Sequence, residues 1–204
     1  PPRPLPPPRR EPVQKRSRER FERMLQAASE LIAEGGSDAM KMSDVAERAG
    51  VPIGSVYQFF PDKAAIVWTL AERSHAESRK CIEEGLAAAA TTAELRAAFS
   101  ALFDTYYGLF LAEPTMRDIW TAMQADKALS VLEMAESRKN GAILAAALER
   151  VSPDADPVRL ETSAFLIMHL GEAAVRLAIS APRGEGDRIV EAYKAMADRE
   201  LARA

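Results

Sequence analysis

The chain has 204 residues, of which 48% are hydrophobic and 28% are charged. This length and apolar content allow one or two compact domains with a real core. Alanine, leucine, glutamate and arginine dominate and β-branched runs are absent, so we expect an all-α fold. The single cysteine, Cys81, excludes a disulfide framework within the chain and favours a reducing, cytoplasmic location. No apolar run approaches the roughly 20 residues of a membrane-spanning helix, and the start lacks the apolar core of a secretion signal.

The net charge of −3 hides an asymmetry along the chain. Residues 1–23 contain eight Lys or Arg and three Glu, so this segment carries +5 and the remainder carries −8. A basic arm ahead of an acidic body suits binding of nucleic acid at one end only, although charged termini are also common as solvated tails. Residues 1–12 are rich in proline, and we expect a disordered or extended arm there.

Helical periodicity begins with a helix from about Gln14 to Glu34, ended by Gly35 and Gly36. The next segment, residues 43–63, predicts a short helix, a glycine turn at Gly50 and a second short helix stopped by Pro61. Val45, Ala46 and Ala49 form the buried face of the first short helix, and Val56 and Phe60 that of the second. The other face of the second helix, with Ser55, Tyr57, Gln58 and Phe59, has no evident core role and suits phosphates and base edges.

This segment resembles the DNA-binding region of the TetR family of transcription regulators. With the preceding helix the resemblance covers about residues 14–70. The matching residues are Asp44-Val45-Ala46, Ala49-Gly50-Val51, Gly54-Ser55-Val56-Tyr57, Phe60-Pro61 and Lys63. The resemblance implies a three-helix helix-turn-helix domain at residues 13–62 and a helical ligand-binding and dimerisation domain at residues 63–204. A helical hairpin in an unrelated bundle is the alternative for the motif alone.

The resemblance also implies which residues face double-stranded operator DNA. Gly54 lets the backbone approach closely, Ser55 and Tyr57 suit phosphates, and Gln58 can read adenine with two hydrogen bonds. Lys63 is expected on a phosphate, and Arg16 and Arg18 on the backbone or the minor groove. The full predicted set is Arg16, Arg18, Lys41, Ser43, Pro52, Ile53, Gly54, Ser55, Tyr57, Gln58, Phe59 and Lys63.

Two positions depart from the family pattern. Lys41 stands where members often carry a capping Ser or Thr; it can bind phosphate but cannot cap, and Ser43 can cap a slightly shorter helix. Ile53 stands where many members have a polar or basic residue, and it can contact a thymine methyl or simply pack. These departures concern the operator sequence rather than DNA binding itself.

Five longer helices and one short helix are expected after the motif. Asp62 can cap a helix that runs to about Ala90, and Thr91-Thr92 open another that Glu113-Pro114 interrupts. A short helix around Trp120 follows, and the remaining helices span about Lys127–Val151, Pro157–Ser180 and Asp187–Arg203, with residues 182–186 as a hairpin. The helix Pro157–Ser180 is apolar nearly all round, so it needs cover on most sides. In TetR-like proteins the last two helices form a four-helix dimer interface, which implies a homodimer; ordinary intrachain core is the alternative.

Large aromatic and sulfur-containing side chains are concentrated in the middle and late parts of the chain. Packing accounts for most of them, yet such groups also line apolar pockets for small molecules, and TetR-like regulators usually bind an inducer in this domain. We therefore expect a cavity for a small hydrophobic or aromatic ligand. Its predicted lining is Phe103, Tyr107, Trp120, Met123, Met168 and His169.

Other candidate sites are weak. His75 and Cys81 are six apart, off one helical face, with no third metal ligand nearby. His169 and Glu172 share a face of an apolar helix, where a satisfied polar contact is more common than a catalytic dyad. No glycine-rich phosphate loop, Ser-His-Asp order or zinc spacing is present in the sequence, so we expect no catalysis, metal or cofactor. The sequence favours a ligand-responsive repressor over its alternative, a helical small-molecule-binding protein without operator function.

Overall fold

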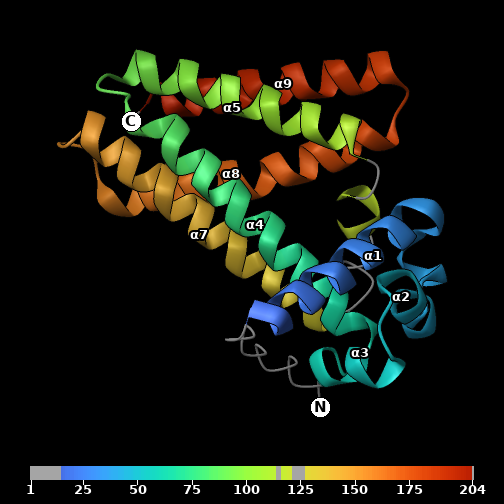
Figure 1. Ribbon diagram of the computed structural model, residues 1–204. Helices are drawn as coiled ribbons and strands as arrows, with labels where there is room; N and C mark the ends of the chain where they lie inside the picture. The colour runs from blue at the N-terminus through green and yellow to red at the C-terminus, as the bar shows by residue number, and fades with distance from the viewer. Residues whose placement is uncertain (1–14, 114–115, 121–126, 204) are drawn as a thin grey trace. The chain divides into compact units, whose positions relative to one another are not determined.

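The computed structural model describes residues 15–113, 116–120 and 127–203, so the predicted arm at 1–12 lies outside the described residues (Figure 1). Every named element in this part of the chain is an α-helix, which confirms the all-α prediction. A short helical segment, 116–120, precedes α7. The named helices are α1 (Lys15–Ala39), α2 (Met42–Ala49), α3 (Ile53–Phe59), α4 (Lys63–Ala87), α5 (Thr92–Ala112), α7 (Lys127–Val151), α8 (Pro157–Ser180) and α9 (Arg183–Leu201).

The chain divides into two compact units. The N-terminal unit comprises the described parts of Pro1–Ser74 and Glu113–Leu132, and the C-terminal unit comprises the described parts of His75–Ala112 and Glu133–Ala204. The division between these units falls inside α4, between Ser74 and His75, because the first half of α4 packs with the short helices. The segment 116–120 also belongs to the N-terminal unit.

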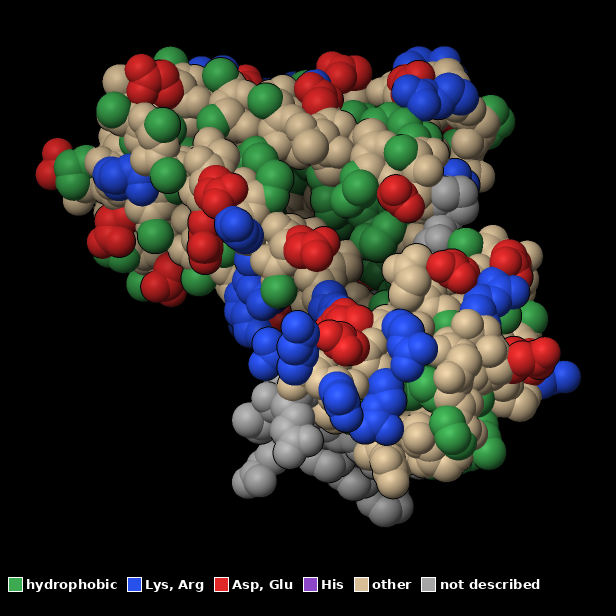
Figure 2. All heavy atoms as spheres, in the orientation of Figure 1, with side chains coloured by type: hydrophobic (Ala, Val, Ile, Leu, Met, Phe, Trp, Pro, Cys, Tyr) green, Lys and Arg blue, Asp and Glu red, His purple; other side chains and the backbone are tan. Residues whose placement is uncertain are grey.

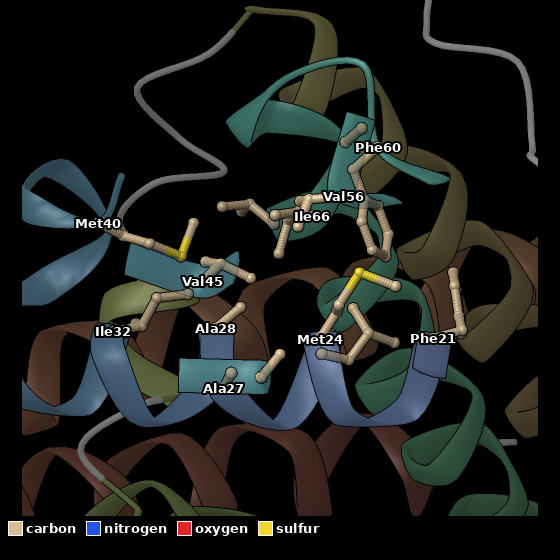
Figure 3. Close-up of a cluster of buried hydrophobic side chains, with 14 of the residues drawn as sticks. Phe21, Met24, Ala27, Ala28, Ile32, Met40, Val45, Val56, Phe60 and Ile66 are labelled. Atoms are coloured by element: carbon tan, nitrogen blue, oxygen red, sulfur yellow. The ribbon is translucent and has the colours of Figure 1, made fainter. Parts of the chain in front are cut away.

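The core of the N-terminal unit is built from one face of each of its helices (Figure 3). The residues of α1 that recur at three- and four-residue steps point toward α2, α3 and the start of α4, as amphipathic spacing requires. Ile119, from the segment after α5, is buried in the same cluster. Fully or nearly fully buried members are Met24, Ala28, Ile32, Val45, Val56, Phe60 and Ile66.

Two ion pairs join neighbouring helices of this unit. The guanidinium of Arg48 on α2 donates to both carboxylate oxygens of Glu34 on α1, at 2.5 and 2.8 Å. Arg73 on α4 donates to both oxygens of Glu22 on α1, at 2.5 and 2.7 Å, and lies over the ring of Phe21. Bidentate pairs fix orientation as well as distance, so they set how α1 lies against α2 and α4.

The expected break in the first helix falls at Gly36. Its φ of 77° and ψ of 163° are not helical, although a further turn continues to Ala39. Only glycine adopts this backbone region without strain, so the glycine pair turns the chain toward α2.

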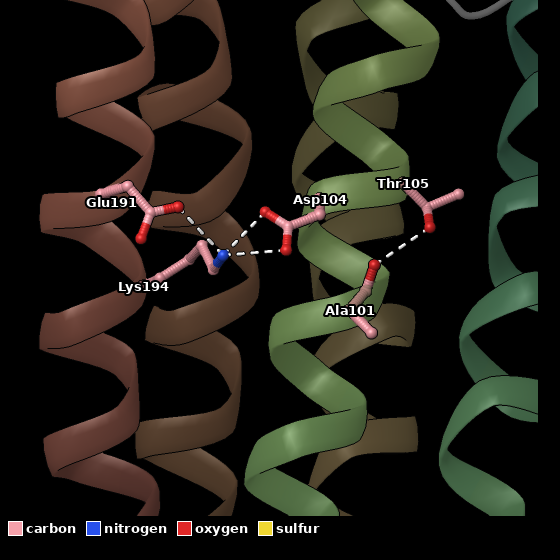
Figure 4. A network of polar contacts seen from close by, with 5 residues as sticks. All are labelled: Ala101, Asp104, Thr105, Glu191 and Lys194. Carbon is pink, nitrogen blue, oxygen red and sulfur yellow. Dashed lines mark hydrogen bonds and ion pairs between the residues drawn. The ribbon is translucent and has the colours of Figure 1, made fainter.

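In the C-terminal unit, α9 lies against α5 and α8. Lys194 on α9 donates to both carboxylate oxygens of Asp104 on α5, at 2.7 and 2.8 Å, and to Glu191 at 3.0 Å (Figure 4). The Lys194 side chain is only 15% exposed, so this pair is better protected from solvent screening than a surface pair. Arg96 and Asp198 form a second, bidentate link between the same two helices.

The start of α9 differs from the sequence prediction. The helix begins at Arg183, within the segment expected to be a hairpin loop, and the amides of Glu185 and Gly186 donate to the carbonyl of Pro182 at 2.9 Å. A Cβ at Gly186 would lie 2.4 Å from the carbonyl oxygen of Ala178 on α8. Gly186 is therefore needed for the close approach of two helices, not for a turn.

Within the described residues, side chains cap the starts of α4, α5 and α8. Asp62 accepts from the amide of Ala65 at 2.9 Å, which confirms the predicted cap of α4. Thr91 accepts from the amide of Glu94 at the start of α5, and the carboxylate of Glu94 accepts from the amide of Ala90, one residue before the cap. Asp156 caps α8 by accepting from the amide of Val158 at 3.1 Å.

The end of α4 is held by a residue of α7. The guanidinium of Arg150 donates to the carbonyl of Leu86 at 2.7 Å and to that of Ala89 at 3.3 Å. The last carbonyls of a helix have no partner within the helix, and a cation there also suits the negative end of the helix dipole. Arg150 thus ties the C-terminal end of α4 to the C-terminal end of α7.

Helix α8 has two apolar faces. One is buried within the unit, through Leu160, Ala164, Ile167, Val175 and Ala178. The other is exposed: Leu166 and Leu170 are each 48% exposed and Leu177 60%, at helical spacings of four and seven residues. Among the described helices, α8 is also long and apolar enough to cross a membrane by length and composition alone, contrary to the expectation that no segment would be. Its buried face and its caps are those of a packed helix.

Candidate DNA-binding and effector sites

The turn between α2 and α3 has the geometry expected of a helix-turn-helix. Gly50 adopts a left-handed conformation, with φ of 63° and ψ of 42°, and its amide donates to the carbonyls of Ala46 and Glu47. The amide of Val51 donates to the carbonyl of Ala46 at 3.0 Å. This closing pattern satisfies the last carbonyls of α2 and directs the chain into α3.

Helix α3 presents most of its predicted DNA-facing residues to solvent. Tyr57 is 51% exposed and Ile53 44%, and Pro52, Gly54 and Gln58 are exposed as well. Nothing lies within 4 Å of the Cβ that an alanine would add at Gly54, so the backbone there is open to a close partner. Ser55 is half-buried. The buried Val56 and Phe60 hold the opposite side of α3 in the core.

Phe59 differs from the rest of the predicted set. It is half-buried, and its ring meets Phe21 edge-on with the ring centroids 5.7 Å apart. The prediction that Phe59 has no role in the core is therefore wrong. It extends the contact between α1 and α3 because Phe21 stacks on Phe60 at the same place.

The start of α2 lacks a side-chain cap. Lys41 is the N-cap residue and makes no capping hydrogen bond, and Ser43 lies in the first helical turn, where its hydroxyl donates to Asp44 at 2.9 Å. Ser43 therefore does not cap a shorter helix as the sequence suggested. Lys41 and Ser43 are both exposed beside open backbone amides.

The first residue of α4 is anchored to the end of α1. The ammonium of Lys63 donates to the backbone carbonyl of Asp38 at 3.1 Å. An ammonium has three donors, so this contact fixes the position of the charge while leaving donors for an anion. Arg16 and Arg18 are exposed at the start of α1, where Lys and Arg side chains gather (Figure 2).

Of the predicted effector residues, Phe103 and Tyr107 are buried between α5 and α9. The ring of Phe103 lies 4.5 Å from that of Tyr193, centroid to centroid, and the hydroxyl of Tyr107 donates to Asp187 at 3.2 Å. Burial and the neighbouring Asp187 raise the pKa of Tyr107. Met168 and His169 are half-buried on α8.

Trp120 belongs to the other compact unit. It is 7% exposed and follows Ile119, which is part of the N-terminal core. The sequence placed Trp120 beside Phe103 in the second domain, whereas the structure assigns the two residues to different units. Met123 lies outside the described residues.

A buried polar cluster occupies the interior of the C-terminal unit, and the sequence indicated only part of it. The hydroxyl of Ser137 on α7 donates to the carboxylate of Glu172 on α8 at 3.0 Å and lies 3.1 Å from Nδ1 of His169. The Ser137 hydroxyl also lies 3.1 Å from the backbone carbonyl of Glu133. Its one proton cannot serve all of these neighbours, so the contact with His169 is best satisfied when Nδ1 of His169 donates to Ser137. Asn140 donates to Glu172 from the next turn of α7. We call Ser137, Asn140, His169 and Glu172 the polar cluster.

Two buried ion pairs border the polar cluster. Arg176 on α8 pairs with Glu133 on α7, and Arg79 on α4 pairs with Glu136 on α7, whose other oxygen accepts from Lys139 at 2.5 Å. Glu133, Ser137 and Asn140 follow the same helical face as the buried Leu144 and Leu148. Polar residues at core positions of a long helix were the sequence signal that would have revealed the cluster.

Electrostatics in this region follow from burial. Desolvation raises the pKa of Glu172 to about 7; Glu133 adds to the rise, while Ser137, Arg176 and Asn140 oppose it. Desolvation likewise raises the pKa of Tyr106 on α5 well above its ordinary value. His75 on α4 has its pKa lowered to about 4 by burial and by Arg79, so it is neutral at pH 7. Cys81, by contrast, is exposed.

Family profiles match both parts of the chain. The family described as "Bacterial regulatory proteins, tetR family" matches residues 24–68, and "Tetracyclin repressor-like, C-terminal domain" matches residues 93–204. The second match alone covers more than half of the chain. The chain therefore belongs to the TetR family of transcription regulators, and the family predicted from the helix-turn-helix is confirmed.

Individual relatives agree with this assignment. A TetR-family transcriptional regulator from Streptomyces coelicolor superposes with a TM-score of 0.69 and 27% identity, over 90% of this chain and 98% of that one. The regulator FadR from Bacillus subtilis, solved in complex with stearoyl-CoA, gives a TM-score of 0.62 at 17% identity over 89% of this chain and 97% of that one, which shows a shared fold. The repressor KstR from Mycolicibacterium smegmatis is 42% identical over 50 residues, 24% of each chain. The match thus spans about a quarter of that relative's length.

Proposed function

We propose that this regulator is a repressor that binds operator DNA as a homodimer and is released by a small-molecule effector. The observation that carries the DNA part is the exposure of Ile53, Gly54, Tyr57 and Gln58 on one face of α3 while the opposite face is buried. In helix-turn-helix proteins the second helix enters the major groove with such a face. A cytoplasmic location follows from this role, because the operator DNA is in the cytoplasm.

The proposed contacts divide by chemistry. Gln58 reads a base edge, because its amide can donate and accept toward adenine. Tyr57, Ser55, Ser43 and Lys41 hold phosphates and so position the helix. Arg16, Arg18 and Lys63 add charge that raises affinity for any DNA. Pro52, Ile53 and Gly54 supply close backbone approach and contact with a thymine methyl.

The homodimer is supported by the exposed apolar face of α8. In a single chain about half or more of the surface of three leucines on this face is exposed, namely Leu166, Leu170 and Leu177. Met196 on α9 is 58% exposed. Contiguous exposed apolar residues of this kind mark interaction surfaces. A two-fold pair of α8–α9 hairpins covers them and sets two α3 helices about 34–36 Å apart, the spacing of successive major grooves.

The effector part rests on the C-terminal unit. Its interior combines buried aromatic rings with the polar cluster, the composition of small-molecule sites. FadR of Bacillus subtilis, which shares the fold, was solved with stearoyl-CoA. Effector binding favours a conformation that fits the operator poorly, so the effector shifts the population away from the DNA-bound state.

The experiment that tests DNA binding is selection of genomic fragments by the purified full chain, followed by titration of the selected operator at several salt concentrations. Lys63→Ala should weaken binding equally across sequences and lower the slope of log affinity against log salt by about one. Lys80→Ala, an exposed lysine of the other half of α4, is the control and should match wild type. Absence of any salt-dependent DNA binding would favour a small-molecule-binding protein without operator function.

A further inference from the structure

The polar cluster contains a carboxylate without a cation of its own. Glu133 is paired with Arg176, and Glu136 with Arg79 and Lys139. Glu172, which lies among them, receives hydrogen bonds only from the neutral Ser137 and Asn140 within the described residues. Burying a charge without a partner is costly, and the raised pKa of Glu172 reflects that cost.

The same cluster contains an unused acceptor. Asn140 is 8% exposed, and its Oδ1 is buried without a hydrogen-bond partner among the described residues. Its amide nitrogen is directed to Glu172, so the oxygen is directed elsewhere in the same interior. Buried polar atoms are rarely left unpaired. The cluster therefore lacks a hydrogen-bond donor for Oδ1 of Asn140 and a positive charge beside the carboxylate of Glu172.

Accessible surface remains in this interior. Tyr106, His169 and Glu172 are not fully buried, yet desolvation dominates the pKa of both Tyr106 and Glu172. Figure 2 shows hydrophobic side chains in a hollow between α5 and α4.

We propose that the effector of this regulator is an organic amine, whose protonated nitrogen is bound by Glu172 and Asn140 and whose apolar part lies against the aromatic side chains of α5. This inference rests on the proposed effector function and specifies its ligand. An ammonium supplies both the charge and the donors that the polar cluster lacks. A carboxylate ligand is disfavoured because it would face Glu172 and Glu133, and the neighbouring Arg79 and Arg176 are already paired.

His169 and Ser137 act as positioning residues in this arrangement. The imidazole is stacked on Phe165, with the ring centroids 5.9 Å apart, and holds the Ser137 hydroxyl, which in turn holds one oxygen of Glu172. Ser137 and Asn140 both donate to this carboxylate, and the amine is bound through the lone pairs that these two contacts leave open. Positioning by a chain of hydrogen bonds keeps the carboxylate in place before the ligand arrives.

The test uses matched sets of compounds on the full chain. Each set carries one apolar skeleton, such as phenylbutyl, naphthylmethyl or decyl, ended by an amine, an alcohol or a carboxylate. Thermal-shift measurements rank the sets and isothermal titration gives affinities for the best one. The amine should bind about tenfold or more tightly than its alcohol, the effect of one charged hydrogen-bonded contact. Equal or tighter binding of the alcohol or the carboxylate, or no binding by any amine, overturns the proposal.

Variants separate this proposal from the proposed function. Glu172→Gln should remove the preference for the amine while leaving affinity for the alcohol within about twofold. Glu161→Gln, an exposed glutamate of the same helix, should leave both unchanged. Operator binding is measured without ligand in every case. If Glu172→Gln binds operator and keeps the wild-type preference for the amine, the role of Glu172 is contradicted. If the wild-type chain binds no operator, the proposed function is contradicted instead.

Discussion

At the scale of single residues, Gly50 controls the geometry of the DNA-binding motif. Its left-handed conformation is one that residues with a Cβ adopt at a cost of roughly 1–2 kcal/mol. We expect Gly50→Ala to lower the free energy of unfolding by about that amount, measured by urea denaturation. Gly54→Ala is the matched control, because the added methyl meets nothing within 4 Å. It should leave stability intact and weaken operator binding; equal stability of the two variants would contradict the role of the turn.

The raised pKa of Glu172 leads to a second prediction, which concerns the dependence of stability on pH. Its pKa is about 7 in the folded chain against an ordinary 4.5. Between these two pH values the folded chain retains a proton that the unfolded chain has released, so the contribution of Glu172 to stability falls as pH rises through this window. Glu172→Gln removes this loss of stability, because glutamine does not ionise. The variant should gain stability relative to wild type from about pH 4.5 to about pH 7, by up to roughly 3 kcal/mol.

Urea denaturation at a series of pH values measures this difference. The carboxylates of Glu22, Glu34 and Asp198 have lowered pKa values because of their arginine partners and act in the opposite direction. The comparison is therefore between the variant and wild type, not along one curve. A difference in stability that does not change with pH would contradict the burial of Glu172.

The sequence predicted residue roles well where spacing alone decides them. Val45, Val56 and Phe60 are buried as expected because helical periodicity places them on one face. Phe59 was misjudged because an aromatic residue beside that face can turn either outward or, as here, toward Phe21 on another helix. Ser137 and Asn140 were missed because their partner Glu172 is more than thirty residues away in the chain.

At the scale of elements, the contact between α8 and α9 depends on Gly186. A Cβ there would lie 2.4 Å from the carbonyl oxygen of Ala178 and 2.9 Å from the hydroxyl of Tyr107. Gly186→Ala should therefore push the helices apart and lower the free energy of unfolding by about 2 kcal/mol, the usual scale of overpacking. Gly184→Ala, two residues earlier, meets only the end of Arg188 at 3.9 Å. It should be neutral or stabilising in the same thermal or urea denaturation.

Helix boundaries were predictable where capping chemistry marks them. Asp62, Thr91 and the pair Asp156-Pro157 start helices at or within one residue of the expected places. The start of α9 was not predictable, because glycines near a proline are typical of a turn and only the neighbouring helix reveals that Gly186 is needed for close packing. The two halves of α4 pack with different units although the helix is continuous in its sequence pattern.

At the scale of the whole molecule, the proposed homodimer depends on the exposed face of α8. Leu177→Glu places a charge at its most exposed leucine, which is 60% exposed in one chain. We expect a shift from dimer to monomer in sedimentation velocity at micromolar concentration, with loss of operator binding, because one recognition helix cannot hold both half-sites. Leu109→Glu, on α5 and 41% exposed, is the control and should remain dimeric. A dimeric Leu177→Glu variant would place the interface elsewhere.

Arg150 fixes one end of α4, and this helix is long enough to reach well into the N-terminal unit. The helix has 25 residues, so it is about 37 Å long at a rise of 1.5 Å per residue. Arg150 binds the carbonyls at the C-terminal end of α4. At the other end, Ala65 and Ile66 are buried with residues of α1, α2 and α3. Because α4 is continuous over these 25 residues, a single helix contributes one half to the packing of each compact unit.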